Sequence, residues 1–180
     1  PAPADTAARR ELVQIFSFFE DIPEAPFLSE LPWDWRSWSE YRRSAERNVH
    51  PRANLAAFVG HIALRLAVLG VDAWQRAARP DEVARMVELL DDGLAAGALG
   101  LSSNLMDHDG NDRAVPSIRA DDAELRALLE VVARHPGATF QVIIDTFRKL
   151  EGAESLERIA RLSADLPLRV QWAGLPTSLF

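Results

Sequence analysis

The sequence predicts an α/β protein with a parallel-stranded sheet, and two observations carry that prediction. Short apolar segments without polar alternation recur along the chain, and amphipathic helical segments separate them. Buried strands joined by helices are typical of right-handed crossovers, in a parallel sheet covered on both faces. Such a sheet is either doubly wound or part of a (β/α) barrel.

Residues 1–50 are expected to form a helical segment rich in proline and tryptophan. From Asp5 to Phe19, apolar residues recur at helical spacing and Asp5 is suited to cap the helix. Residues 20–35 are expected to be irregular, because their three prolines each lack a backbone donor. A second helix is expected at residues 37–47.

Residues 51–180 are expected to hold repeated β/α units, so that residues 1–180 form a single domain. The helix expected at 80–97 has Asp81 near its start and Gly97 at its end. The strands are expected at 54–61, 98–103, 138–145 and 168–172, and the further helices at 121–137 and 155–167.

Composition limits the classes of partner. The chain has 180 residues, a net charge of −7 and no cysteine. Interspersed charges of this sign exclude a nucleic-acid surface, and the lack of cysteine excludes disulfides and thiolate metal ligands. The longest apolar run, Leu64 to Val71, is interrupted by Arg65 and is too short to span a bilayer. Without a signal peptide at its start, the chain is expected to be soluble and cytoplasmic.

Polar side chains lie at the end of each expected strand. They are His61, Ser102, Ser103, Asn104, Gln141, Asp145 and Gln171. Because the carboxyl ends of parallel strands carry the active site in α/β folds, these residues are candidates for one site. The alternative is that each strand simply ends where polar residues begin. Gly60, before His61, would let the backbone turn sharply there.

The loop at 104–117 contains Asp107, His108, Asp109 and Gly110. A calcium loop of the EF-hand type is excluded, because the glycine falls fourth and the twelfth residue is Ile118. A zinc site in this loop alone also fails, because His108 has no second histidine near it. The pattern leaves two interpretations open: a solvated turn, or one part of a site assembled from several loops.

Four segments in order carry a family resemblance: "FEDIPEAPFLSELPWDWRSWSEY" (19–41), "AAFVGHIALRLAVLG" (56–70), "GLAAGALGLSSN" (93–104) and "HDGNDRAVPS" (108–117). They resemble the N-acyl-D-amino-acid deacylase (D-aminoacylase) branch of the amidohydrolase superfamily. Members are metal-dependent hydrolases that cleave the amide of N-acylated D-amino acids, on a TIM barrel beside a small β-sandwich. The resemblance implies a partial barrel, roughly strands 3 to 6 with their helices, and zinc in the full-length parent. It also makes His61, Ser102, Ser103, His108, Gln141 and Gln171 candidate substrate-binding residues.

The chain departs from the family pattern in its metal ligands. The early His-x-His pair and strand-end cysteine of the family lie upstream of the matched part, and its late aspartate lies downstream. The two later strands read "FQVIID" and "RVQWAG", with glutamines and no histidine. This chain alone is therefore expected to be inactive. The alternative is a non-catalytic, barrel-derived domain that binds a small molecule or a partner chain. Either way, open sheet edges predict a homo-oligomer.

Overall fold

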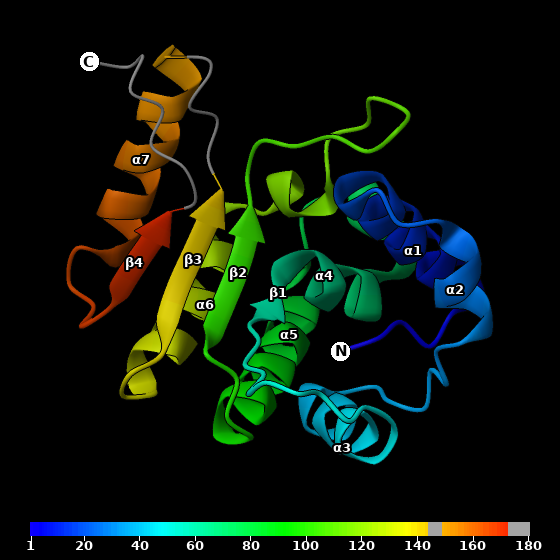
Figure 1. The fold of residues 1–180 in the computed structure, drawn as a ribbon. Coiled ribbons are helices and arrows are strands. Elements are labelled where there is room, and N and C mark those ends of the chain that lie inside the picture. The colour runs from blue at the N-terminus through cyan, green and yellow to red at the C-terminus, as the bar shows by residue number, and fades with distance from the viewer. Residues whose placement is uncertain (144–148, 173–180) are drawn as a thin grey trace.

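The computed structural model describes residues 1–143 and 149–172, and its centre is one parallel sheet (Figure 1). The strands are β1 (Val59–Gly60), β2 (Gly100–Asn104), β3 (Thr139–Ile143) and β4 (Arg169–Trp172), and they lie in the order β1-β2-β3-β4. All three pairings are parallel. The predicted α/β class with a parallel sheet is therefore confirmed. Consecutive order is that of part of a barrel, whereas a doubly wound sheet reverses its order at a switch point.

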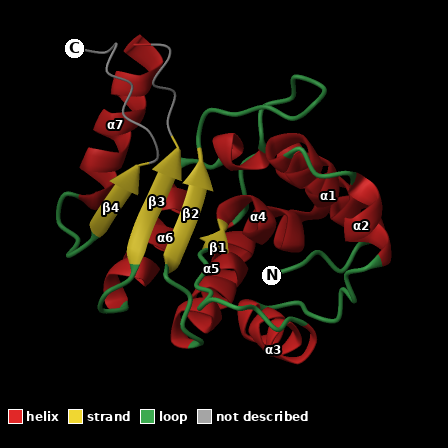
Figure 2. Ribbon diagram, viewed as in Figure 1, coloured by secondary structure: helices red, strands yellow, loops and turns green. Residues whose placement is uncertain are grey.

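Three helices cover one face of the sheet: α5 (Pro80–Ala95), α6 (Asp122–Arg134) and α7 (Lys149–Ser163) (Figures 1 and 2). The core lies between them and the sheet, where Leu101 and Phe140 meet Leu90 and Leu128. On the opposite face, Asn104 is buried and the other strand side chains are half-buried or exposed. The sheet is therefore covered more completely on the helix face than on the opposite face.

The N-terminal segment contains three helices: α1 (Thr6–Glu20), α2 (Glu24–Ser29) and α3 (Trp38–Asn48). Asp5 caps α1 as expected, accepting a hydrogen bond from the backbone N–H of Ala8 at 2.8 Å. The expectation that residues 20–35 are irregular is wrong at α2. Pro23 precedes this helix and Pro26 lies in its first turn, where backbone donors have no helical partner, so neither proline breaks it.

The segment from 54 to 79 differs most from the prediction. The strand expected at 54–61 is only β1, and His61 begins helix α4 (His61–Leu69), which leads into the 3₁₀ helix η1 (Gly70–Trp74). Neither helix was predicted, because a continuous apolar run fits a buried strand and a buried helix equally well. Gly60 has an ordinary φ of −81°, so the turn into α4 does not need a glycine.

The remaining elements match the prediction closely. Helix α5 begins with Pro80, and the carboxylate of Glu82 accepts a hydrogen bond from the backbone N–H of Arg79 at 2.8 Å. Asp121 caps α6, which a short 3₁₀ helix η2 (Pro116–Arg119) precedes. Helix α7 starts earlier than the expected residue 155. Asp145, expected at the end of β3, lies outside the described residues.

Register divides the strand residues into two faces. Leu101 pairs with Phe140, and both are fully buried beneath the helices. Ser102 is next to Leu101 and therefore points to the opposite face, which we call the free face. Its partners in register are Gln141 on β3 and, through Gln141, Gln171 on β4.

Candidate functional site

Ser102, Gln141 and Gln171 form one row across β2, β3 and β4 on the free face. Adjacent strands lie about 4.8 Å apart, so the three side chains stand side by side. Ser102 and Gln141 are half-buried and Gln171 is exposed. A hydroxyl and two carboxamides supply both donors and acceptors to a ligand, without a charge. We call these three residues the polar row.

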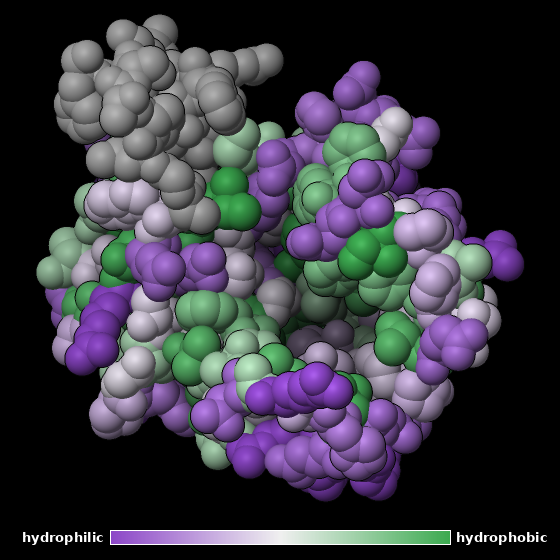
Figure 3. Space-filling model, in the orientation of Figure 1, coloured by the Kyte–Doolittle hydropathy of each residue, from purple (hydrophilic) through white to green (hydrophobic). Residues whose placement is uncertain are grey.

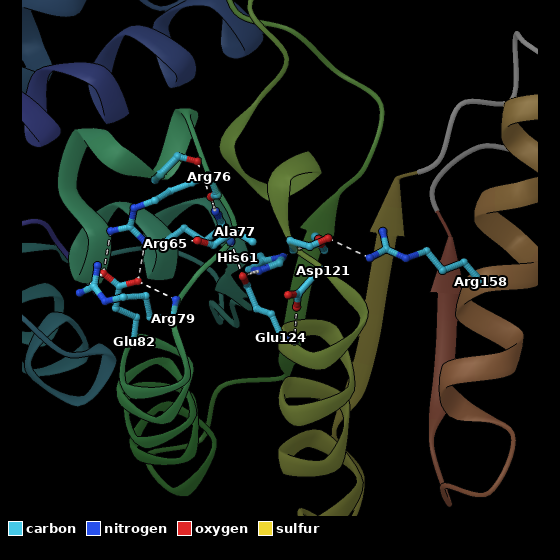
Figure 4. A network of polar contacts seen from close by, with 12 residues as sticks. His61, Arg65, Arg76, Ala77, Arg79, Glu82, Asp121, Glu124 and Arg158 are labelled. Carbon is cyan, nitrogen blue, oxygen red and sulfur yellow. Dashed lines mark hydrogen bonds and ion pairs between the residues drawn. The ribbon is translucent and has the colours of Figure 1, made fainter.

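His61 and Ser103 belong to the other face. Nδ1 of His61 lies 2.8 Å from Oγ of Ser103, and Nε2 lies 2.7 Å from Oε1 of Glu124 on α6 (Figure 4). The second oxygen of Glu124 accepts a hydrogen bond from Arg65, which lies one turn after His61 on α4. We call His61, Arg65, Ser103 and Glu124 the buried network. Its side chains are 0–2% exposed.

The charges within the buried network compensate one another. The guanidinium of Arg65 pairs with Glu124 and also donates to the backbone carbonyls of Ala73 at 3.3 Å and Arg76 at 2.6 Å. Burial by itself would raise the pKa of Glu124, but its hydrogen bonds with His61 and Arg65, together with the charge of Arg65, outweigh burial and lower it. Glu124 is therefore held as a carboxylate inside the protein.

The serine, histidine and glutamate of the buried network do not form a hydrolase triad. In such a triad the serine contacts Nε2 of the histidine and the carboxylate contacts Nδ1. Here the two ring nitrogens have the opposite partners, and Ser103 is buried beneath helices. Ser103 is therefore not placed to attack a substrate, and the buried network stabilises the fold. Substrate binding by His61 and Ser103 stays a prediction.

The loop at 104–117 follows the carboxyl end of β2 and folds back on itself, with a bridge between His108 and Ala114. Asp109 is buried and accepts hydrogen bonds from the backbone N–H groups of Asn111 and Arg113, each at 2.9 Å. Burial would raise the pKa of Asp109, but these bonds and the Arg113 side chain outweigh burial and lower it. Asp109 thus stabilises the turn instead of facing a ligand.

Arg113 ties the loop to the N-terminal half of the chain. Its guanidinium lies 2.6 Å from Glu11 on α1 and 4.0 Å from the ring centroid of Trp74. The side chain of His108 is 58% exposed, with Nε2 3.9 Å from Asp112. His108 is therefore on the rim of the molecule, and its part in substrate binding stays a prediction.

The described residues do not fit a metal ion. They contain no group of three or more histidine, aspartate or glutamate side chains that could hold one. The polar row offers a hydroxyl and two carboxamides, whereas zinc prefers imidazole, thiolate and carboxylate ligands. The polar row therefore has the chemistry of a site for an uncharged polar ligand group and not of a zinc site.

Figure 3 shows a hollow between the sheet and the N-terminal helices, with both hydrophobic and hydrophilic residues around it. Another hollow, of about 670 Å³, lies between α3 and residues 51–57, before β1 begins. It includes Trp38, Tyr41 and Leu55 and lies toward the amino ends of the strands. Ligands of parallel α/β folds bind at the carboxyl ends, so this hollow is not the candidate site.

Among the described residues, no helix is long and apolar enough to cross a membrane.

We compared the chain with protein families and with known proteins. No protein-family model matches the chain. An uncharacterized protein of Mycobacterium tuberculosis is 31% identical over 199 aligned residues, covering 95% of this chain and 32% of that protein. The D-aminoacylase of Alcaligenes xylosoxydans xylosoxydans is 31% identical over 120 residues, covering 65% of this chain and 22% of that enzyme. The chain thus spans about a third or less of the curated relatives it matches.

Solved structures agree with the sequence matches. A D-aminoacylase crystal structure, described as defining a novel subset of amidohydrolases, has a TM-score of 0.59 and 26% identity over 76% of this chain and 26% of its own. N-acyl-D-glutamate deacylase from Bordetella bronchiseptica, in complex with zinc and a phosphonate inhibitor, shares the fold, with a TM-score of 0.65 and 24% identity. It covers 94% of this chain and 30% of its own.

The parallel sheet and these matches make the chain similar to one section of amidohydrolases of the D-aminoacylase type. The predicted resemblance to the N-acyl-D-amino-acid deacylase (D-aminoacylase) branch is therefore confirmed.

Sequence analysis did not predict the roles of Glu124 and Arg65. The spacing of His61 and Arg65 carries a signal, because residues four apart share one face of a helix. His61 was interpreted as the end of a strand and no helix was predicted after it, so the helical spacing of the two residues was not recognised. Nothing in the sequence pairs either residue with Glu124, which lies 63 positions after His61.

Proposed function

We propose that this chain forms part of the substrate-binding wall of a metal-dependent amidohydrolase that hydrolyses N-acyl-D-amino acids. The observation that carries the proposal is the polar row, on the free face of a sheet with barrel-type strand order. The four strands correspond to roughly strands 3 to 6 of the barrel. The similarity to D-aminoacylases supports the reaction class.

The polar row can form hydrogen bonds with the polar groups of such a substrate. An N-acylated amino acid presents an amide and a carboxylate, which accept hydrogen bonds from hydroxyl and carboxamide groups. Gln141 is in the centre of the row and can contact ligand atoms bound to either neighbour. His61, Ser103 and His108 belong to the same proposal only as residues around this wall. Zinc of the full-length parent would be held by residues of other segments.

Calorimetric titration with N-acetyl-D-amino acids tests the proposal, with the L-enantiomers for comparison. We expect the D-compounds to bind and Gln141→Leu to weaken binding about tenfold, because one hydrogen bond to a charged or polar group is lost. Gln14→Leu, on the exposed side of α1, is the matched control and should bind normally. Equal affinity of Gln141→Leu and the unchanged chain would contradict the role of the polar row.

The chain alone is expected to bind without hydrolysing, because the described residues supply no metal ligands. Release of free amino acid, measured by amine derivatisation with and without added zinc, should therefore be absent. Release would contradict this part of the proposal.

A second candidate function is a non-catalytic domain that binds a small molecule or a partner chain. It is favoured because the described residues contain no group of three or more histidine, aspartate or glutamate side chains that could hold a metal ion. The sheet edges favour it too, since β1 and β4 each pair on one side only among the described strands. Unpaired edges favour strand addition, and we propose that copies of this chain associate through them. Light scattering at high micromolar concentration should show a dimer or larger species, and a monomer would contradict association.

A further inference from the structure

The buried network connects three separate elements at one point. His61 and Arg65 belong to α4, Glu124 to α6 and Ser103 to β2. Ser103 follows Ser102 directly, and the two side chains point to opposite faces of the sheet. A force on Ser103 from the helix side therefore acts on the backbone that presents Ser102 to the free face.

The hydrogen-bond partners assign the proton on the His61 ring. Glu124 is a carboxylate and only accepts, so Nε2 of His61 must donate to it. Nδ1 is then free to accept the hydroxyl hydrogen of Ser103. A doubly protonated ring would add a second buried cation beside Arg65, against the single carboxylate of Glu124, which is costly in a dry interior.

We propose that His61 is a positioning residue: as the Nε2–H tautomer, it fixes the carboxyl end of β2 through Ser103. The end of β2 has two further anchors. The hydroxyl of Ser117 donates to the carbonyl of Asn104, and the backbone N–H of Leu105 donates to Ile143 at 2.9 Å. These hold the backbone after the strand, whereas Ser103 is held from the helix layer. Only the benefit to substrate binding rests on the proposed function, since the ordering of β2 is a property of the chain itself.

Nitrogen-15 NMR of histidine-labelled protein tests the proton assignment. The chain has four histidines, and His61→Gln identifies the resonances of His61 by their loss. We expect one protonated and one unprotonated ring nitrogen, with the unprotonated one shifting in Ser103→Ala. A doubly protonated ring, or a proton on Nδ1, overturns the assignment.

Amide hydrogen exchange tests the positioning. In Ser103→Ala, the amides of residues 102–105 should exchange about tenfold faster than in the unchanged chain, as expected for the loss of one buried hydrogen bond. Ser44→Ala is the control, because Ser44 is as buried as Ser103 but lies on α3. Ser103→Thr keeps the hydroxyl and should restore slow exchange.

Equal exchange at residues 102–105 in Ser103→Ala and Ser44→Ala overturns the positioning role, whatever the outcome of ligand titrations. Conversely, faster exchange at these residues with no binding of N-acyl-D-amino acids supports the positioning role and counts against the proposed function. The two proposals therefore fail separately.

Discussion

Replacing Glu124 by glutamine tests whether the buried network stabilises the fold. The substitution keeps the shape but removes the charge that faces Arg65. It also replaces one of the two acceptor oxygens, which face His61 and Arg65, with an NH2 group that only donates. Both side chains are 0% exposed, so no water replaces the lost partner. Removing one member of a buried ion pair costs about 3–5 kcal/mol, because the other charge stays buried without compensation. For a protein of this size that corresponds to a fall in Tm of about 6–20 °C.

Urea unfolding at neutral pH, with Glu130→Gln as the matched control, measures this cost. Glu130 is on the same helix and pairs with Arg126 at 2.7 Å, but the side chains of Arg126 and Glu130 are 31% and 46% exposed to solvent. Exposed pairs contribute about 0–1 kcal/mol. We therefore expect the free energy of unfolding to fall several-fold further in Glu124→Gln than in Glu130→Gln. Equal losses would refute the argument that burial gives this ion pair its importance.

Three further predictions concern other parts of the molecule. Hydrogen bonds from Arg76, with help from the backbone N–H of Arg79, outweigh burial and lower the pKa of Glu82 to about 2. The pKa of Glu82 in the folded protein lies below its ordinary value. Glu82 therefore stabilises the fold when the pH is above the ordinary pKa, and this contribution is lost as the pH falls toward 2. Glu82→Gln should thus differ most from the unchanged chain in urea unfolding near pH 6 and least near pH 3. Gly100→Ala should lower the free energy of unfolding by about 3 kcal/mol or more, because the added Cβ would lie 1.8 Å from the carbonyl oxygen of Thr139. Gly60→Ala is the control: its Cβ would lie 3.8 Å from the nearest atom, so this variant should unfold at a similar urea concentration to the unchanged chain. Arg113→Ala should speed proteolytic cleavage within residues 107–113 several-fold, because the loop loses its contacts with Glu11 and Trp74; an unchanged cleavage rate would show that Asp109 alone holds the turn.

The local elements with strong signals were predictable from the sequence. Helices α5 and α6 have apolar faces at helical spacing and acidic residues at their starts, so both were predicted close to their observed bounds. The parallel sheet followed from apolar strands alternating with such helices. The segment at 54–79 was not predictable in this way, since its apolar residues fit strand and helix alike.

Some features of the candidate site were likewise predictable from the sequence, and others were not. The sequence predicted the polar residues Ser102, Ser103, Gln141 and Gln171 on the strands, but it placed His61 on a strand although His61 begins α4. It also predicted the family resemblance from four matching segments. Which face each residue occupies depends on register, because neighbours along a strand point to opposite sides. Ser102 and Ser103 are adjacent in sequence, yet one belongs to the polar row and the other to the buried network.

Sequence by itself therefore determined the α/β class, the order of the elements from α5 to β4 and the family resemblance of this chain. Tertiary structure alone decided that Gln141 shares a row with Ser102 and that Glu124 pairs with His61 and Arg65. The physical reason is that local propensity and periodicity act within a few residues. Burial and charge compensation act between residues that only the folded chain brings into contact.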